Sequence, residues 1–91
     1  MPKITIERFA TLVFRLCLLH GGSVTSWIRS AQRNADFGGV TRSAHLVGLG
    51  VDIVLDSISE KDKMIIEARR LNLFALDEGD HVHISVPREA R

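Results

Sequence analysis

The chain has 91 residues, of which 45% are hydrophobic and 25% are charged, a composition typical of one small globular domain. Its net charge of +1 gives no electrostatic reason to expect nucleic acid or a membrane surface as a partner. No segment approaches the roughly 20 apolar residues of a membrane span, and the single cysteine, Cys17, excludes an internal disulfide framework. We therefore expect one domain over residues 1–91 that is a monomer.

The first expected element is a helix from Thr5 to about His20, because apolar side chains recur there at helical spacing. Thr5 can cap its start, and the two glycines that follow His20 can end it. Glu7 and Arg15 interrupt the apolar run, so we interpret the segment as a core-facing helix and not as an export signal. The protein is then expected to be cytoplasmic on synthesis.

Two strands and a short helix are expected next. Residues 23–28 and 46–55 favour strands because β-branched and other apolar side chains dominate them, although Gly48 and Gly50 weaken the second one. Between them, Ser30 can cap a short helix that ends at the glycine pair 38–39.

A second main helix is expected after Ser57 or Ser59, either of which can cap it. Its charged residues, Lys61 among them, are expected to face water. Its apolar face at helical spacing consists of Met64, Ile65, Ala68 and Leu71.

The C-terminal part predicts a hairpin. Residues 74–76 favour a strand edge, 77–80 a turn, and 81–86 a strand that places valine and isoleucine on one face and histidine on the other. Pro87 ends this strand, and the tail 88–91 is expected to fray. The resulting fold class is α+β, with two main helices beside a small, mostly antiparallel sheet.

His45 and Asp52 are the first candidates for chemistry, with six residues between them in a Gly-rich apolar run. A carboxylate between Val51 and Ile53 in a buried strand needs a cation or several donors, and no lysine or arginine lies within six residues of it. Imidazole and carboxylate both suit zinc. A surface histidine with a capping aspartate is the alternative, and the residues alone leave both interpretations open.

A second cluster, Asp80-His81-Val82-His83, follows about thirty residues later. His81 and His83 share one face of the expected strand, where they can be a metal ligand and an assistant, or simply exposed histidines. Asp80 can act as the general base of a metallopeptidase, or it can serve only as a turn former beside Gly79. Glu78 competes for the same catalytic role.

These segments together resemble the peptidase M15 family, zinc D-Ala-D-Ala carboxypeptidases and peptidoglycan endopeptidases that include phage endolysins and share the hedgehog fold. The family pattern is T-S-x-x-R-S, then N and G-G, then S-x-H-x-x-G-x-A-x-D-I, and finally D/E-x-x-H. The chain matches it with T-S-W-I-R-S at 25–30, Asn34, the glycines 38–39, S-A-H-L-V-G-L-G-V-D-I at 43–53 and D-H-V-H at 80–83.

The resemblance implies a role for each matching residue. His45, Asp52 and His83 match the zinc ligands, and Asp80 matches the catalytic acid or base. Arg29 matches the arginine that holds a substrate carboxylate or polarises its carbonyl, and Ser43 matches a serine that contacts the substrate. Two positions depart from the pattern, because Gly50 replaces the usual alanine and His81 the frequent tryptophan. His81 is also a candidate to stabilise an oxyanion.

The expected function is zinc-dependent hydrolysis of an amide bond in the peptide stem of peptidoglycan, as a D,D-carboxypeptidase or an L,D- or D,D-endopeptidase. A phage or prophage product that acts on the cell wall after release would fit a chain without an export signal. The alternative is a non-catalytic zinc-binding or virion structural domain that keeps the same fold.

Overall fold

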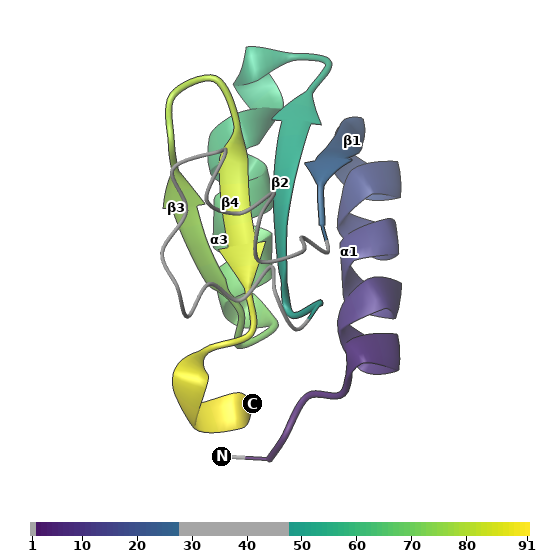
Figure 1. Cartoon of the computed structure of the whole chain (residues 1–91). Coiled ribbons are helices and arrows are strands. Elements are labelled where there is room, and N and C mark those ends of the chain that lie inside the picture. The colour runs from purple at the N-terminus through teal and green to yellow at the C-terminus, as the bar shows by residue number, and fades with distance from the viewer. Residues whose placement is uncertain (1, 28–47) are drawn as a thin grey trace.

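The computed structural model describes residues 2–27 and 48–91, which form an α+β fold with two helices and a four-stranded antiparallel sheet (Figure 1). The sheet has the strand order β1-β2-β4-β3, so the expected fold class is confirmed. The helices are α1 (Ile6–His20) and α3 (Lys61–Arg70). The strands are β1 (Gly22–Ser26), β2 (Gly50–Leu55), β3 (Phe74–Asp77) and β4 (Val82–Ser85), and two short 3₁₀ helices are η2 (Ile58–Glu60) and η3 (Arg88–Ala90).

Local signals set both ends of α1, as expected. The Thr5 hydroxyl accepts a hydrogen bond from the Arg8 amide at 3.1 Å, which satisfies one of the free N–H groups at the helix start. Gly21 follows the helix in the left-handed conformation, with φ at 70°, and its N–H donates to the Cys17 carbonyl. Cys17 is partly buried on this helix, and burial raises the pKa of its thiol.

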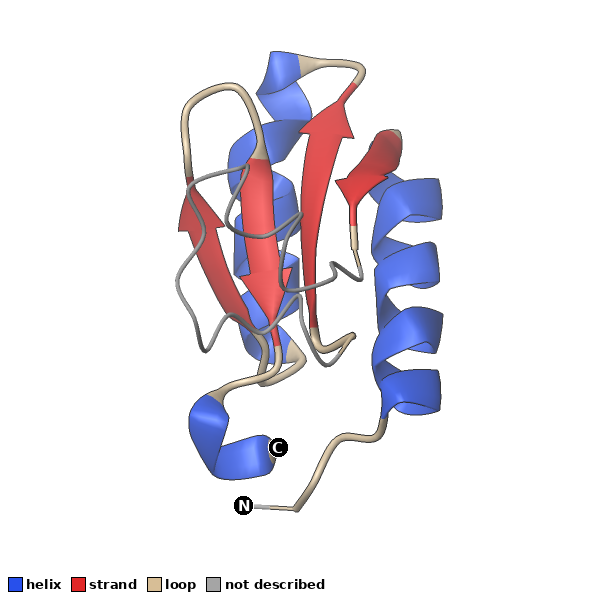
Figure 2. Ribbon diagram, in the orientation of Figure 1, coloured by secondary structure: helices blue, strands red, loops and turns tan. Residues whose placement is uncertain are grey.

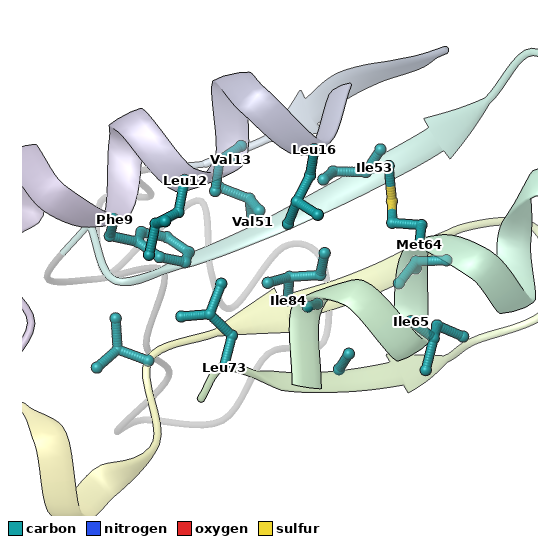
Figure 3. Close-up of a cluster of buried hydrophobic side chains, with 14 of the residues drawn as sticks. Phe9, Leu12, Val13, Leu16, Val51, Ile53, Met64, Ile65, Leu73 and Ile84 are labelled. Carbon is teal, nitrogen blue, oxygen red and sulfur yellow. The ribbon is translucent and has the colours of Figure 1, made fainter. Parts of the chain in front are cut away.

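Both helices pack on one face of the sheet, and Figure 3 shows their apolar side chains meeting those of β2 and β4. Successive residues of a strand point to opposite faces, so Val51 and Ile53 on β2 enter the core together with Val82 and Ile84 on β4. Asp52 and His83 alternate with these core residues and consequently point to the opposite face of the sheet. The helices contribute Phe9, Leu12, Val13, Leu16, Met64, Ile65 and Ala68 to this core.

Close packing explains the glycine at the start of β1. A Cβ atom at Gly22 would lie 2.7 Å from Cγ2 of Ile53, closer than side-chain atoms approach one another, and 3.2 Å from Cε of Met64. The chain can pass this close to β2 only because residue 22 has no side chain.

The expected cap of the second helix is wrong. A 3₁₀ turn, η2, precedes α3, so the residue that flanks α3 is Glu60 and neither serine caps it. The hydroxyls of Ser57 and Ser59 instead lie 2.8 Å apart and share a hydrogen bond. The expected apolar face is correct, because Met64, Ile65 and Ala68 are buried and Leu71 packs against the core.

The sheet differs from expectation mainly at its boundaries (Figure 2). β1 ends at Ser26, after which the Trp27 indole donates to the Gly48 carbonyl at 2.8 Å and packs edge-on against Phe9. β2 begins at Gly50, because Gly48 turns the chain with φ at 74°. The short helix expected between Ser30 and residues 38–39 lies outside the described residues.

The C-terminal tail was expected to fray, but it is ordered and packs against the fold. Residues Arg88–Ala90 form η3, Ala90 is fully buried, and its carbonyl accepts a hydrogen bond from the Ile4 amide at 2.8 Å. The Arg91 guanidinium also donates to the Val86 carbonyl. These contacts supply the burial and hydrogen bonding that hold a chain end in place. Neither described helix is long and apolar enough to cross a membrane.

Candidate functional site

Asp52 and His83 form the centre of the candidate site. They are direct partners in the antiparallel register of β2 and β4, and Nδ1 of His83 lies 3.1 Å from Oδ1 of Asp52. Both side chains are mostly buried, with exposed fractions of 14% and 18%. Their common sheet face follows from the hydrophobic pattern, because burial of the neighbouring valines and isoleucines turns both polar side chains to the other face of the sheet.

Phe74 supports the ring of His83 from the neighbouring strand. The two ring centroids are 6.2 Å apart with an interplanar angle of 64°, an edge-on arrangement. β3 places Phe74 on the same sheet face as His83, because Leu76 is the direct partner of His83 and Phe74 lies two residues before it. His83 is therefore held between an aromatic ring and a carboxylate.

His81 lies between two carboxylates. Its Nδ1 is 2.7 Å from Oδ1 of Asp80, and its Nε2 is 3.8 Å from Oδ1 of Asp52. The hydrogen bond with His81 is the main cause that holds the pKa of the Asp80 carboxyl below its usual range. Asp80 is 92% exposed, and the His81 ring links it to Asp52.

A hydrogen-bonded turn carries Asp80 and His81 between β3 and β4. The Gly79 N–H donates to the Asp77 carboxylate at 2.9 Å, and the Glu78 N–H donates to the His81 carbonyl at 3.0 Å. The turn expected at 77–80 is present but covers residues 78–81, because Asp77 belongs to β3, and Gly79 adopts a φ of 92° that favours glycine. The Gly79 hydrogen bond, followed by one from Lys61, lowers the pKa of the Asp77 carboxyl.

Lys61 was expected to face water, but its side chain packs against the β3–β4 turn. Its side chain is only 15% exposed, and Nζ donates to the Gly79 carbonyl at 2.6 Å and to Oδ1 of Asp77 at 3.1 Å. Asp77 lies sixteen positions after Lys61, so no local sequence pattern could have indicated this contact. The contact arises because the start of α3 and the β3–β4 turn meet at the same end of the sheet (Figure 1).

The described residues bring together four of the seven predicted site residues: Asp52, Asp80, His81 and His83. The other three, Arg29, Ser43 and His45, lie outside the described residues. Within residues 2–27 and 48–91, no three histidine, cysteine or acidic side chains converge closely enough to hold a metal ion. The described part of the site thus offers two adjacent donors, from Asp52 and His83, and the third predicted ligand is His45.

A small open pocket of about 140 Å³ adjoins the turn. Its polar lining comes from Lys61, Gly79, Asp80 and His81, and its apolar lining comes from Ile53, Leu55, Ile58 and Val82. Asp80 and His81 therefore have space on one side that water or a small group can enter.

No family model matches the chain, and the searches of curated proteins and of solved structures found no significant match. The resemblance to the peptidase M15 family is therefore a prediction from the motif residues of the sequence alone.

Proposed function

We propose that the protein is a zinc-dependent metallopeptidase that hydrolyses an amide bond in the peptide stem of bacterial peptidoglycan. The observation that carries the proposal is the Asp52–His83 pair, in which two side chains predicted to be zinc ligands are direct strand partners with donor atoms 3.1 Å apart. A hedgehog-like arrangement of the whole domain is part of the proposal.

The spacing of this pair fits a shared zinc ion. Two donor atoms that each lie roughly 2.0–2.1 Å from a tetrahedral zinc ion are about 3.3–3.4 Å from each other, close to the observed separation. A carboxylate oxygen and an imidazole nitrogen are both donors that zinc accepts. His45 would be the third ligand, which leaves the fourth position open as in catalytic zinc sites.

The chain's own residues supply the proton transfers. Zinc, when bound, would polarise the scissile carbonyl and make water a stronger acid. Asp80 accepts a proton from the attacking water and returns it to the leaving amine as the amide bond breaks. The hydrogen bond with His81, which lowers the pKa of the Asp80 carboxyl, keeps it ionised at neutral pH. His81 donates a hydrogen bond to the oxygen on which negative charge develops.

Two further residues would bind the substrate. The planar guanidinium of Arg29 suits a bidentate contact with a carboxylate of the peptide stem, and Ser43 would contact the same stem. Release from the cell as a phage endolysin, or incorporation into a virion, would bring such an enzyme to the cell wall.

The test is incubation of zinc-loaded protein with purified muropeptides, followed by mass spectrometry of the products. Loss of a single terminal alanine indicates a carboxypeptidase, and two peptide fragments indicate an endopeptidase. Asp80→Ala serves as the matched inactive control. If the parent protein binds one zinc ion and releases no product, the non-catalytic zinc-binding or virion structural alternative replaces the proposal.

A further inference from the structure

Lys61 lies outside the predicted site and contacts the turn that carries Asp80 and His81. Its ammonium group donates to the Gly79 carbonyl at 2.6 Å and to the Asp77 carboxylate at 3.1 Å. The side chain is 15% exposed, whereas that of Lys63 on the same helix is 68% exposed. Lys61 is thus held against the turn, and Lys63 is a solvated lysine of the same element.

The ammonium group fixes both sides of the turn. Asp77 Oδ1 accepts hydrogen bonds from Lys61 and from the Gly79 N–H, while the Gly79 carbonyl accepts the second bond from Lys61. The next residue is Asp80, which bonds to His81, and His81 in turn faces Asp52. One charged group therefore ties the backbone just before Asp80 to the start of α3.

We propose that Lys61 is a positioning residue, which holds the β3–β4 turn so that Asp80 and His81 remain in reach of the Asp52–His83 pair. This inference rests on the proposed peptidase function. Lys61 does not touch the reacting atoms, because its contacts are with Asp77 and Gly79.

The expected consequence is a loss of rate and not of substrate affinity. A displacement of about 1 Å in a catalytic group can cost about 100-fold in rate, and the turn is attached to α3 through this lysine. The Asp52–His83 pair depends on the β2–β4 ladder instead, so zinc binding does not require Lys61.

The experiment compares Lys61→Met, Lys61→Arg and the control Lys63→Met with the parent protein. For each, kcat and KM on the muropeptide, zinc content, and hydrogen exchange at the Gly79 amide are measured. We expect Lys61→Met to lower kcat about tenfold or more, to leave KM and zinc content within about a factor of two, and to speed exchange at Gly79. Lys61→Arg should recover much of the rate because it keeps the cation and its donors, and Lys63→Met should match the parent.

A second variant covers the case in which Lys61→Met does not fold. Asp77→Asn keeps an acceptor for the Gly79 N–H but removes the charge that faces Lys61, so it should show the same changes on a smaller scale. An unchanged kcat in Lys61→Met overturns the inference, whether or not hydrogen exchange at Gly79 becomes faster. An inactive parent that binds zinc overturns the proposed function as well, which distinguishes the two failures.

Discussion

Asp52 and His83 face each other across the β2–β4 ladder, with the carboxylate oxygen and the ring nitrogen 3.1 Å apart on the sheet face away from the helices. Two strands thereby bring together one acid and one imidazole that are 31 positions apart in the sequence. The pairing is fixed by the register, because a slip of one residue in either strand would turn the polar group of that strand into the apolar core.

Zinc binding is the first test of this pair. Metal analysis after dialysis against trace zinc should give about one equivalent per chain for the parent. His45→Ala, Asp52→Ala and His83→Ala should each lose most of it, because each removes a proposed ligand. His81→Ala should retain its zinc, since Nε2 of His81 is 3.8 Å from Asp52 and His81 is not a proposed ligand. An undiminished zinc content in His45→Ala would refute the assignment of the third ligand.

Asp80→Ala should keep zinc and lose about 10²- to 10⁴-fold in kcat, the range expected when a general acid or base is removed. The measurement is kcat on muropeptides together with zinc content. Glu78→Ala is the matched control in the same turn and should remain active. If Glu78→Ala is inactive and Asp80→Ala is not, the proton-transfer role belongs to Glu78.

Arg29→Ala should reduce kcat/KM about tenfold or more, because loss of a charge-assisted bidentate contact costs roughly 1.5–3 kcal/mol. The melting temperature and zinc content should stay close to those of the parent. Arg29→Lys should recover only part of the loss, since an ammonium group cannot reproduce the planar fork. Cleavage by Arg29→Ala at the parent rate would show that the family resemblance misassigns this position.

Glu60 should make stability depend on pH. Its carboxylate lies 3.1 Å from Nδ1 of His20 and 3.2 Å from Nζ of Lys63, and these contacts, His20 first, lower the pKa of the Glu60 carboxyl. The contribution is therefore fully present above the usual pKa of a glutamate and is lost as the pH falls through the lower folded-state pKa. Glu60→Gln should melt at a lower temperature than the parent at pH about 7, and this difference should be smaller at pH about 3.

The control for this prediction is Glu67→Gln, which removes a partly exposed carboxylate that lies 3.7 Å from Arg70. Thermal melts of both variants at the two pH values give the comparison. An equal difference between Glu60→Gln and the parent at both pH values would contradict the linkage.

Gly22→Ala should destabilise the fold. The new Cβ would lie 2.7 Å from Cγ2 of Ile53 in the core, and overpacking of this kind costs about 1–3 kcal/mol. Each kcal/mol lowers the melting temperature by roughly 4–8 °C in a domain of this size. Ser23→Ala, at the next and exposed position of β1, should melt like the parent. Equal melting of Gly22→Ala and the parent would show that β1 can move away from β2.

Features determined by nearby residues could be predicted from the sequence. The limits of α1 follow from Thr5 and Gly21, and the buried faces of α3 and β4 follow from hydrophobic periodicity. The same alternation predicted that His81 and His83 share a sheet face away from the core.

Features determined by distant contacts could not be predicted. Lys61 looks like any charged residue of a surface helix, and only the three-dimensional meeting of α3 with the β3–β4 turn reveals its contacts. The tail after Pro87 was expected to fray, yet Ala90 is buried and its carbonyl accepts a hydrogen bond from the Ile4 amide, more than eighty residues earlier. The register that pairs Asp52 with His83 likewise depends on the whole sheet.

The hydrogen bond between the Ile4 amide and the Ala90 carbonyl has a practical consequence for protein engineering. It places the beginning and the end of the fold side by side, at the opposite end of the sheet from the β3–β4 turn (Figure 1). A circular permutant that joins them through a short linker and opens the chain elsewhere is therefore geometrically accessible. Affinity tags or fused modules attached at either end would likewise extend away from Asp80 and His81.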